Sequence, residues 1–316
     1  MKWNRTAVCV LCMMLWLALP GFAAEPAPHV TAQTTLTELR ANPAIQGTGY
    51  YTYCREMGPI MAECWKNKKL SEYFGTTDGA PGIAALNLII DNYNKGVQVT
   101  YQVYSPEEIA ADSSLGCVQL YYYPAETPGA RTAIVVPGNS LTITSEMGEG
   151  GSTAYELHEL GYAVFVLRYR TFLDLAGNAP LQDLARAVQR VTELAPQLQI
   201  QTQDYALVGY SSGGQLCGVF ANREKGYGHY GAAKPGALLL AYSVINFSEV
   251  KLAYKLVLDP NDWGWHFYCA NVNQMVTPDY PPVYFWYGKN DQTLPWMINA
   301  VQGPALQKAL EANGVP

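Results

Sequence analysis

One serine of this chain lies in a setting that favours nucleophilic chemistry. Ser211 is the centre of Gly209-Tyr-Ser-Ser-Gly213, a G-x-S-x-G sequence that follows the apolar run 205–208 and precedes small residues at helical spacing. A strand, a tight turn and a helix with serine at the apex form a nucleophile elbow, where glycines let strand and helix approach closely. The N–H of Ser212 then opens the helix and can point at an oxyanion. The alternative is a glycine-rich turn without chemistry, because so short a pattern also arises by chance.

The elements that must position this serine follow a regular alternation from residue 97 onward. Apolar or alternating runs predict strands at 97–104, 118–123, 132–136, 162–167, 205–208, 237–242 and 282–287. Helical spacing predicts helices at 149–160, 180–194, after Ser211, and at 304–313. Strands that alternate with helices predict an α/β fold, doubly wound around a mainly parallel sheet. The irregular stretch 243–280 predicts a lid-like insertion.

The part before residue 97 divides in two. Residues 1–23 read as a signal peptide, with Lys2 and Arg5 before an apolar run and small residues around Ala23. The alternative is an uncleaved anchor. Since no later run is long and apolar enough to span a membrane, we expect a secreted or periplasmic protein without membrane attachment after cleavage. Residues 24–96 predict a partly helical N-terminal extension that packs on the main domain.

Composition limits the classes of function. A net charge of −6 without runs of Lys or Arg argues against nucleic-acid binding. No spacing of Cys, His, Asp or Glu indicates a metal site, and no cofactor is implied. Export permits disulfides, with Cys54 and Cys64 as the pair closest in sequence, whereas Cys217 reads as a small buried thiol behind the elbow.

Several blocks in a fixed order resemble a known family. They are Val136-Pro-Gly-Asn-Ser140, Glu149-Gly150, the run 161–170, Pro180 with Asp183 and Arg186-Ala187, the elbow, and the run 281–291. Together they resemble the α/β-hydrolase fold and, within it, the secreted carboxylesterases related to acetyl-xylan and feruloyl esterases. The resemblance covers residues 97–316.

The resemblance implies roles for further residues. Asp291, in the loop after the strand at 282–287, corresponds to the acid that orients the histidine of a catalytic triad. The alternative is an ordinary loop carboxylate. A second oxyanion donor is expected from the backbone of Asn139 or Ser140, in a loop where relatives carry further glycines. The alternative for that loop is a plain turn at the end of a strand.

The general base is the part of the triad that the sequence does not supply. The family's histidine follows a last helix and strand, and this sequence stops at Gly314-Val-Pro316, where that strand would begin. Of the four histidines, His266 in the lid-like stretch is the best placed, and each of the four reads more simply as an ordinary polar residue. Either the sequence is a fragment that lacks the last strand and helix, which we expect, or the protein has lost its base and binds without catalysis.

The functional expectation is therefore a serine hydrolase that cleaves carboxylic esters, impaired as written. The resemblance implies small-molecule or polysaccharide substrates, with acetyl or feruloyl esters of polysaccharides as the expectation. A serine peptidase of the same fold and a non-catalytic glycan-binding or scaffold protein remain alternatives. The oligomeric state and the identity of the acyl group stay open.

Overall fold

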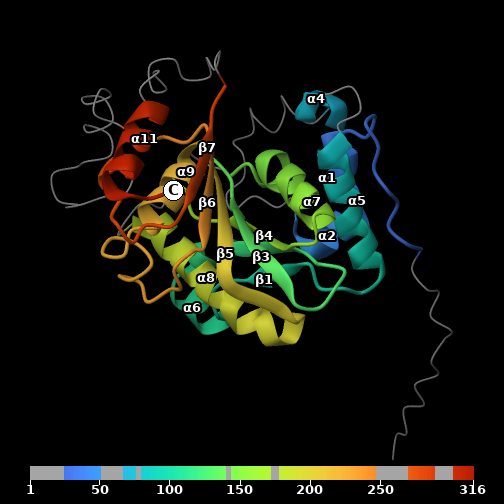
Figure 1. Cartoon of the computed structure of the whole chain (residues 1–316). Coiled ribbons are helices and arrows are strands. Elements are labelled where there is room, and N and C mark those ends of the chain that lie inside the picture. Colours follow the sequence, from blue (N-terminus) through green and yellow to red (C-terminus); the bar gives the residue numbers. More distant parts are fainter. Residues whose placement is uncertain are drawn as a thin grey trace, which may run out of the picture.

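The fold is seen in a computed structural model, which describes residues 25–50, 67–75, 80–139, 144–171, 178–246, 270–288 and 302–316. Within these residues one seven-stranded sheet has the order β1-β2-β4-β3-β5-β6-β7 (Figure 1). The strands are β1 Thr100–Gln102, β2 Gln119–Tyr123, β3 Ala130–Val136, β4 Ala163–Arg168, β5 Ile200–Tyr210, β6 Ala237–Ala241 and β7 Val283–Trp286. β2 is antiparallel to both β1 and β4, and every other pair is parallel, so the predicted mainly parallel sheet is confirmed.

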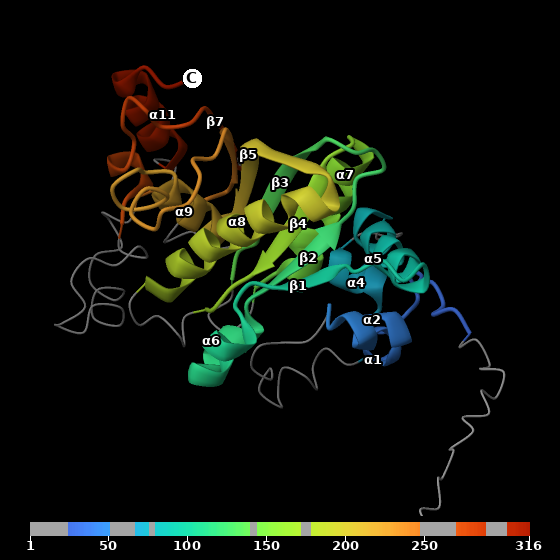
Figure 2. The ribbon, with the colours of Figure 1, turned by 90° about the horizontal axis from the view of Figure 1, so that it is seen from below.

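Helices cover both faces of the sheet. Figure 2 shows α8 (Ala179–Leu198) and α9 (Ser211–Phe220) on one side, and α5 (Ala80–Asn94) on the other. The side of α5 also carries α7 (Ser152–Glu159) and three short helices, which are α1 Leu36–Ala41, α2 Pro43–Thr48 and α4 Leu70–Phe74. On the side of α8 lie α11 (Gln302–Asn313) and the short η6 (Val272–Gln274), while α6 (Pro106–Ala111) and η1 (Ser113–Cys117) follow β1. The predicted doubly wound arrangement is therefore present.

The apolar pattern of each helix explains the face that it buries. In α8 the inward positions predicted from the sequence, Leu181, Leu184, Val188 and Val191, are all buried, and Pro180 occupies the first turn, where its missing N–H costs nothing. On the opposite face, Leu86, Ile89 and Ile90 of α5 join one core cluster with Val164 and Val166 of β4. The extension therefore shares its core with the sheet.

Several elements differ from the expected boundaries. The strand predicted at 97–104 forms only over Thr100–Gln102. The segment predicted as one helix, 149–160, is a π-helical turn η2 (Glu146–Gly151) followed by α7. β5 begins at Ile200, earlier than the apolar run at 205–208, and its pairing with β3 shifts register between Arg131 and Ala133. Residues 201–204 lie at the exposed start of the strand and are polar. The apolar pattern therefore does not indicate this first part of β5.

Among the described residues no helix is long and apolar enough to span a membrane. Cys217 carries a free thiol, and burial raises its pKa, as expected for a structural thiol. The predicted Cys54–Cys64 pair, the signal peptide and most of the lid-like stretch, 247–269, lie outside the described residues.

Candidate active site

Ser211 occupies the sharp turn between β5 and α9. Its backbone has φ +50°, a left-handed conformation that is rare for a residue with a Cβ. Strain of this kind persists where the surroundings fix the backbone, and it is common at functional sites. Here β5 pairs on both sides, with β3 and β6, and α9 begins at Ser211 itself. The turn therefore has the geometry of the predicted nucleophile elbow, at the carboxyl ends of the parallel strands.

Two glycines of the pattern are required by close backbone approach. A Cβ on Gly213 would overlap the carbonyl oxygens of Val136 and Pro137, at the end of β3. A Cβ on Gly209 would come within 2.6 Å of the Cα of Gly214 on the other side of the turn. The glycines of the G-x-S-x-G sequence thus let α9 start directly against β3 and β5. This supports the elbow interpretation over a turn that is glycine-rich by chance.

The loop after β3 lies against the elbow, as the oxyanion prediction requires. The position that a Cβ on Gly138 would take is 3.0 Å from the Cβ of Ser211. The next residue, Asn139, donates its backbone N–H to Oγ of Ser212 over 3.0 Å. The structure thus brings together Ser211, Ser212 and Asn139, with one predicted donor already engaged by a hydroxyl. Ser140 lies outside the described residues.

Tyr169, which directly follows β4, holds this loop from one side. Its hydroxyl donates to the carbonyl oxygen of Pro137 over 2.7 Å and accepts from Nδ2 of Asn139 over 3.3 Å. The side chain is buried, with 1% exposure. A rigid, desolvated phenol with two such contacts fixes the loop relative to the sheet.

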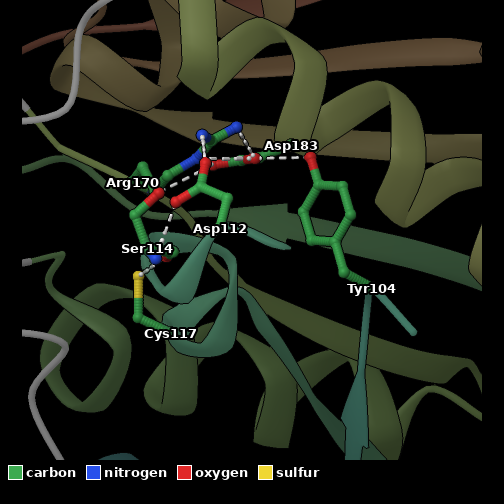
Figure 3. A network of polar contacts seen from close by, with 6 residues as sticks. All are labelled: Tyr104, Asp112, Ser114, Cys117, Arg170 and Asp183. Atoms are coloured by element: carbon green, nitrogen blue, oxygen red, sulfur yellow. Dashed lines mark hydrogen bonds and ion pairs between the residues drawn. The ribbon is translucent and has the colours of Figure 1, made fainter. Parts of the chain in front are cut away.

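A buried ion pair holds the chain that carries Tyr169. Arg170 pairs with Asp183 of α8 over 2.7 Å, and Asp183 also accepts from the backbone N–H of Arg170 and the hydroxyl of Tyr104 (Figure 3). In the same view Asp112, whose Oδ1 accepts the N–H of Ser114, lies with its Oδ2 3.9 Å from Nη1 of Arg170. Since Asp183 is completely buried, its charge must be met by these partners. The network joins the end of β4 to the start of α8.

Glu149 is a residue of the site that sequence reasoning did not assign a role. Its Oε2 accepts the N–H of Gly138 over 2.6 Å, and its Oε1 accepts the hydroxyl of Tyr242 over 2.7 Å. Burial raises the pKa of Glu149, although the hydrogen bonds from Tyr242 and Gly138 favour its charged form. The only signal in the sequence was its place among the blocks that resemble the esterase family.

Aromatic side chains surround the elbow on the side of α7. The ring of Tyr210 lies 5.6 Å from that of Tyr242 and 6.3 Å, edge-on, from that of Trp286 on β7. The hydroxyl of Tyr210 is 2.5 Å from Oγ1 of Thr153 in α7. Trp286 and its neighbour Tyr284 are partly exposed. The residue beside the nucleophile is therefore held by both the sheet and α7.

The predicted acid and the candidate bases of the triad are not found among the described residues around Ser211. Asp291 and His266 fall in the undescribed ranges 289–301 and 247–269. The other three histidines have neighbours elsewhere: His29 pairs with Asp91 over 2.7 Å, the ring of His158 lies near Tyr155, and that of His229 lies against Tyr230. Within the described part of the chain, no group of three or more His, Cys, Asp or Glu could hold a metal ion.

Comparison with known proteins gives a consistent result. The BD-FAE family model matches residues 118–234. The chain is 26% identical over 199 residues to an acetylxylan esterase from Xylanibacter ruminicola, which covers 59% of this chain and 39% of that protein. It is 24% identical over 174 residues to endo-1,4-beta-xylanase B from Butyrivibrio fibrisolvens, which covers 51% of this chain and 27% of that protein. The matches thus span well under half the length of these curated relatives.

Solved structures share the fold. The structure of an acetyl ester-xyloside bifunctional hydrolase from Caldicellulosiruptor lactoaceticus superposes with a TM-score of 0.55 at 22% identity, over 69% of this chain and 82% of that one. Together with the observed sheet order and elbow, this likeness shows the α/β-hydrolase fold.

Proposed function

We propose that this chain, which has the α/β-hydrolase fold and is related to esterases of that fold, is a serine hydrolase that cleaves carboxylic esters. The observation that carries the proposal is Ser211 itself, held at φ +50° at the apex of a turn in which Gly209 and Gly213 leave no room for a side chain. A hydroxyl fixed in this way at the carboxyl edge of a sheet meets the geometric need of acyl transfer.

In the proposed reaction the Oγ of Ser211 attacks the acyl carbon and forms a tetrahedral oxyanion. The N–H of Ser212, at the start of α9, and that of Asn139 or Ser140 stabilise the negative charge. Asn139 donates to Oγ of Ser212 in the structure, so an oxyanion has to share or replace that contact. A general base takes the proton of Ser211 and gives it to the leaving oxygen, so that an alcohol departs and an acyl-enzyme remains; water then hydrolyses the acyl-enzyme to the carboxylic acid and free Ser211.

The acid and base of the triad are finer parts of the proposal. Asp291 is the proposed acid, because it follows β7 in the order that this fold uses. We propose that the base is missing from this chain as written, since the three described histidines have neighbours elsewhere; His266 lies outside the described residues. An incomplete triad generally lowers the rate by about three to six orders of magnitude. Free imidazole in solution is then expected to restore part of the activity that depends on Ser211.

For the substrate we propose acetyl or feruloyl esters of polysaccharides, met outside the cytoplasm after removal of residues 1–23. The support is the kinship with a protein named an acetylxylan esterase and another named a xylanase, together with the BD-FAE match. The proposed partners are thus small-molecule or polysaccharide esters.

The proposal is tested with a panel of substrates. After subtraction of the hydrolysis that imidazole causes without protein, we expect hydrolysis of p-nitrophenyl acetate and release of acetate from acetylated xylan, both increased by imidazole and both absent in Ser211→Ala. Cleavage of peptide anilides in preference to esters would indicate a peptidase instead. Saturable binding of xylan that persists in Ser211→Ala, with no hydrolysis under any of these conditions, would indicate a glycan-binding protein and overturn the proposal.

A further inference from the structure

We propose that Glu149 is a positioning residue, which together with Tyr169 clamps the peptide unit between Pro137 and Gly138 and so sets the direction of the Asn139 N–H at Ser211. This inference rests on the proposed function, because it assigns the clamp to the oxyanion loop of that site.

The clamp holds both ends of one peptide plane. The carbonyl oxygen of Pro137 accepts the hydroxyl of Tyr169 over 2.7 Å, and the N–H of Gly138 donates to Oε2 of Glu149 over 2.6 Å. These two groups belong to a single planar amide, which cannot turn about its C–N bond. With both ends held, the plane has one orientation. The following N–H, that of Asn139, is separated from this plane only by the two backbone dihedrals of Gly138, and in the structure it donates to Oγ of Ser212.

The clamp lies directly beside the nucleophile. The Cβ position of Gly138 is 3.1 Å from Oε2 of Glu149 and 3.0 Å from Cβ of Ser211. The carboxylate of Glu149 and the side chain of Ser211 therefore both lie against Gly138, so close that a methyl group there would crowd both of them. Since both oxygens of Glu149 are occupied, by Gly138 and by Tyr242, the carboxylate orients the loop and does not act as the base.

Glu149 is itself fixed before any substrate arrives. It lies in η2, whose first residue, Glu146, pairs with Arg168 of β4 over 2.6 Å in a buried ion pair. A Cβ on the next residue, Gly150, would come within 2.5 Å of Val166 in β4 and 3.2 Å of Pro137. The π-helical turn η2 thus packs directly against β4 and the end of β3. Such support is what a preorganised oxyanion site needs, since a misplacement of about 1 Å can cost about 10²-fold in rate.

The variants separate shape from hydrogen bonding. Glu149→Gln keeps an acceptor for Gly138 and can donate to the hydroxyl oxygen of Tyr242, so it should retain most activity. Glu149→Leu has a similar volume and no acceptor. We expect its kcat for p-nitrophenyl acetate, measured with imidazole, to fall about 10²-fold with KM nearly unchanged. Glu156→Leu, at an exposed position of α7, is the matched control and should leave kcat unchanged.

A second readout is independent of catalysis. Labelling glycine carbonyl carbon and asparagine nitrogen limits an NMR spectrum to two peptide pairs, Gly138-Asn139 and Gly177-Asn178. The Asn139 amide signal should move in Glu149→Leu and in Tyr169→Phe, stay near its original shift in Glu149→Gln, and be unaffected in Glu156→Leu. An unmoved Asn139 signal in folded Glu149→Leu and Tyr169→Phe would overturn the clamp. If the parent protein shows no hydrolysis that depends on Ser211, the proposed function fails, and this signal still decides whether the clamp exists.

Discussion

At the scale of single residues, the site depends on space as much as on functional groups. Ser211 is presented because its neighbours Gly209 and Gly213 have no side chains, and because backbone strain at Ser211 is held by β5 and α9. The groups that could hold an oxyanion are backbone N–H donors, so their placement follows from the packing of the loop after β3 against the elbow.

Gly213→Ala is expected to disrupt the elbow through packing alone. Its methyl group would overlap the carbonyl oxygens of Val136 and Pro137, which are backbone atoms of a central strand and cannot move aside easily. Overpacking of this kind typically costs about 1–3 kcal/mol of unfolding free energy. The measurement is urea unfolding. Gly116→Ala is the control, because its Cβ would meet only a side-chain methyl of Ile109 at 3.3 Å, and a loss as large as that in Gly213→Ala would contradict the argument.

The buried carboxyl of Glu149 predicts a pH dependence of stability. Its pKa lies above the ordinary 4.5 because of burial, so between the two values the folded state holds more protons than the unfolded state. The free energy of unfolding therefore falls as pH rises through this window. Glu149→Gln cannot ionise and so lacks this loss. As the pH rises through the window, we expect the unfolding free energy of Glu149→Gln, relative to that of the parent protein, to increase by roughly 1.4 kcal/mol for each unit by which the pKa of Glu149 is raised.

Urea unfolding at a series of pH values from below to above this window measures the difference. The exposed Glu156→Gln should show no such trend. A difference between Glu149→Gln and the parent protein that stays constant over the series would show that Glu149 ionises in the folded state as it does in the unfolded chain.

Local and distant information explain which site residues the sequence could predict. Ser211 and its glycines were predicted because the elbow is encoded within five consecutive residues. Glu149 received no role because its hydrogen-bond partners, Gly138 and Tyr242, lie 11 and 93 residues away in the sequence. The residues next to Glu149 do not indicate these contacts. The same holds for Tyr169, whose bond to Pro137 spans 32 residues.

At the scale of elements, the ends of the strands are tied by buried polar contacts. β4 is held at its carboxyl end by Arg170, which pairs with Asp183 of α8, and at its last residue by Arg168, which pairs with Glu146 of η2. The helix α8 and the turn η2, on opposite faces of the sheet, are thus both anchored to β4. That strand also leads into Tyr169, which contacts the loop after β3.

Asp183→Ala is expected to loosen this anchoring strongly. It leaves the guanidinium of Arg170 buried without its main partner, which typically costs about 3–5 kcal/mol of unfolding free energy. Glu193→Ala removes the exposed partner of Arg186 and Arg190 on the same helix and should cost no more than about 1 kcal/mol. Thermal and urea unfolding of the two variants compare the effects. Equal losses would mean that the Arg170–Asp183 pair contributes no more than a surface pair.

Periodicity predicted the strands and helices well where one face alone is buried or where a run is wholly apolar, as in β3 and α8. It failed at η2, since a π-helical turn changes the hydrogen-bond pattern without changing the residue types that favour a helix. It also missed the polar start of β5, whose pairing depends on β3.

At the scale of the whole molecule, the N-terminal extension shares one hydrophobic core with the sheet. Tyr50, at the end of the short N-terminal helices, is 1% exposed, and its hydroxyl lies 2.7 Å from that of Tyr123 in β2. Its carbonyl oxygen accepts from Arg168 of β4 over 3.4 Å. A segment inserted in this way between helices and sheet cannot detach without exposing the core.

We therefore expect one cooperative unfolding transition for the extension and the sheet. Tyr50→Ala should lower the unfolding free energy by about 3–5 kcal/mol, as large-to-small changes of buried aromatic residues do. Tyr50→Phe should cost only about 1–2 kcal/mol, for the hydroxyl contact with Tyr123. Circular dichroism and tyrosine fluorescence should give coincident curves. Separate transitions, or a Tyr50→Ala variant as stable as the parent protein, would show that the extension folds independently.

The most direct test of the central claim is covalent labelling of the serine at the elbow. The protein is treated with a fluorophosphonate, with and without imidazole, and the adduct is located by mass spectrometry of its peptides. The account predicts a single phosphonyl group on Ser211, formed faster with imidazole and missing in Ser211→Ala. No adduct under either condition, or an adduct that persists in Ser211→Ala, would contradict it.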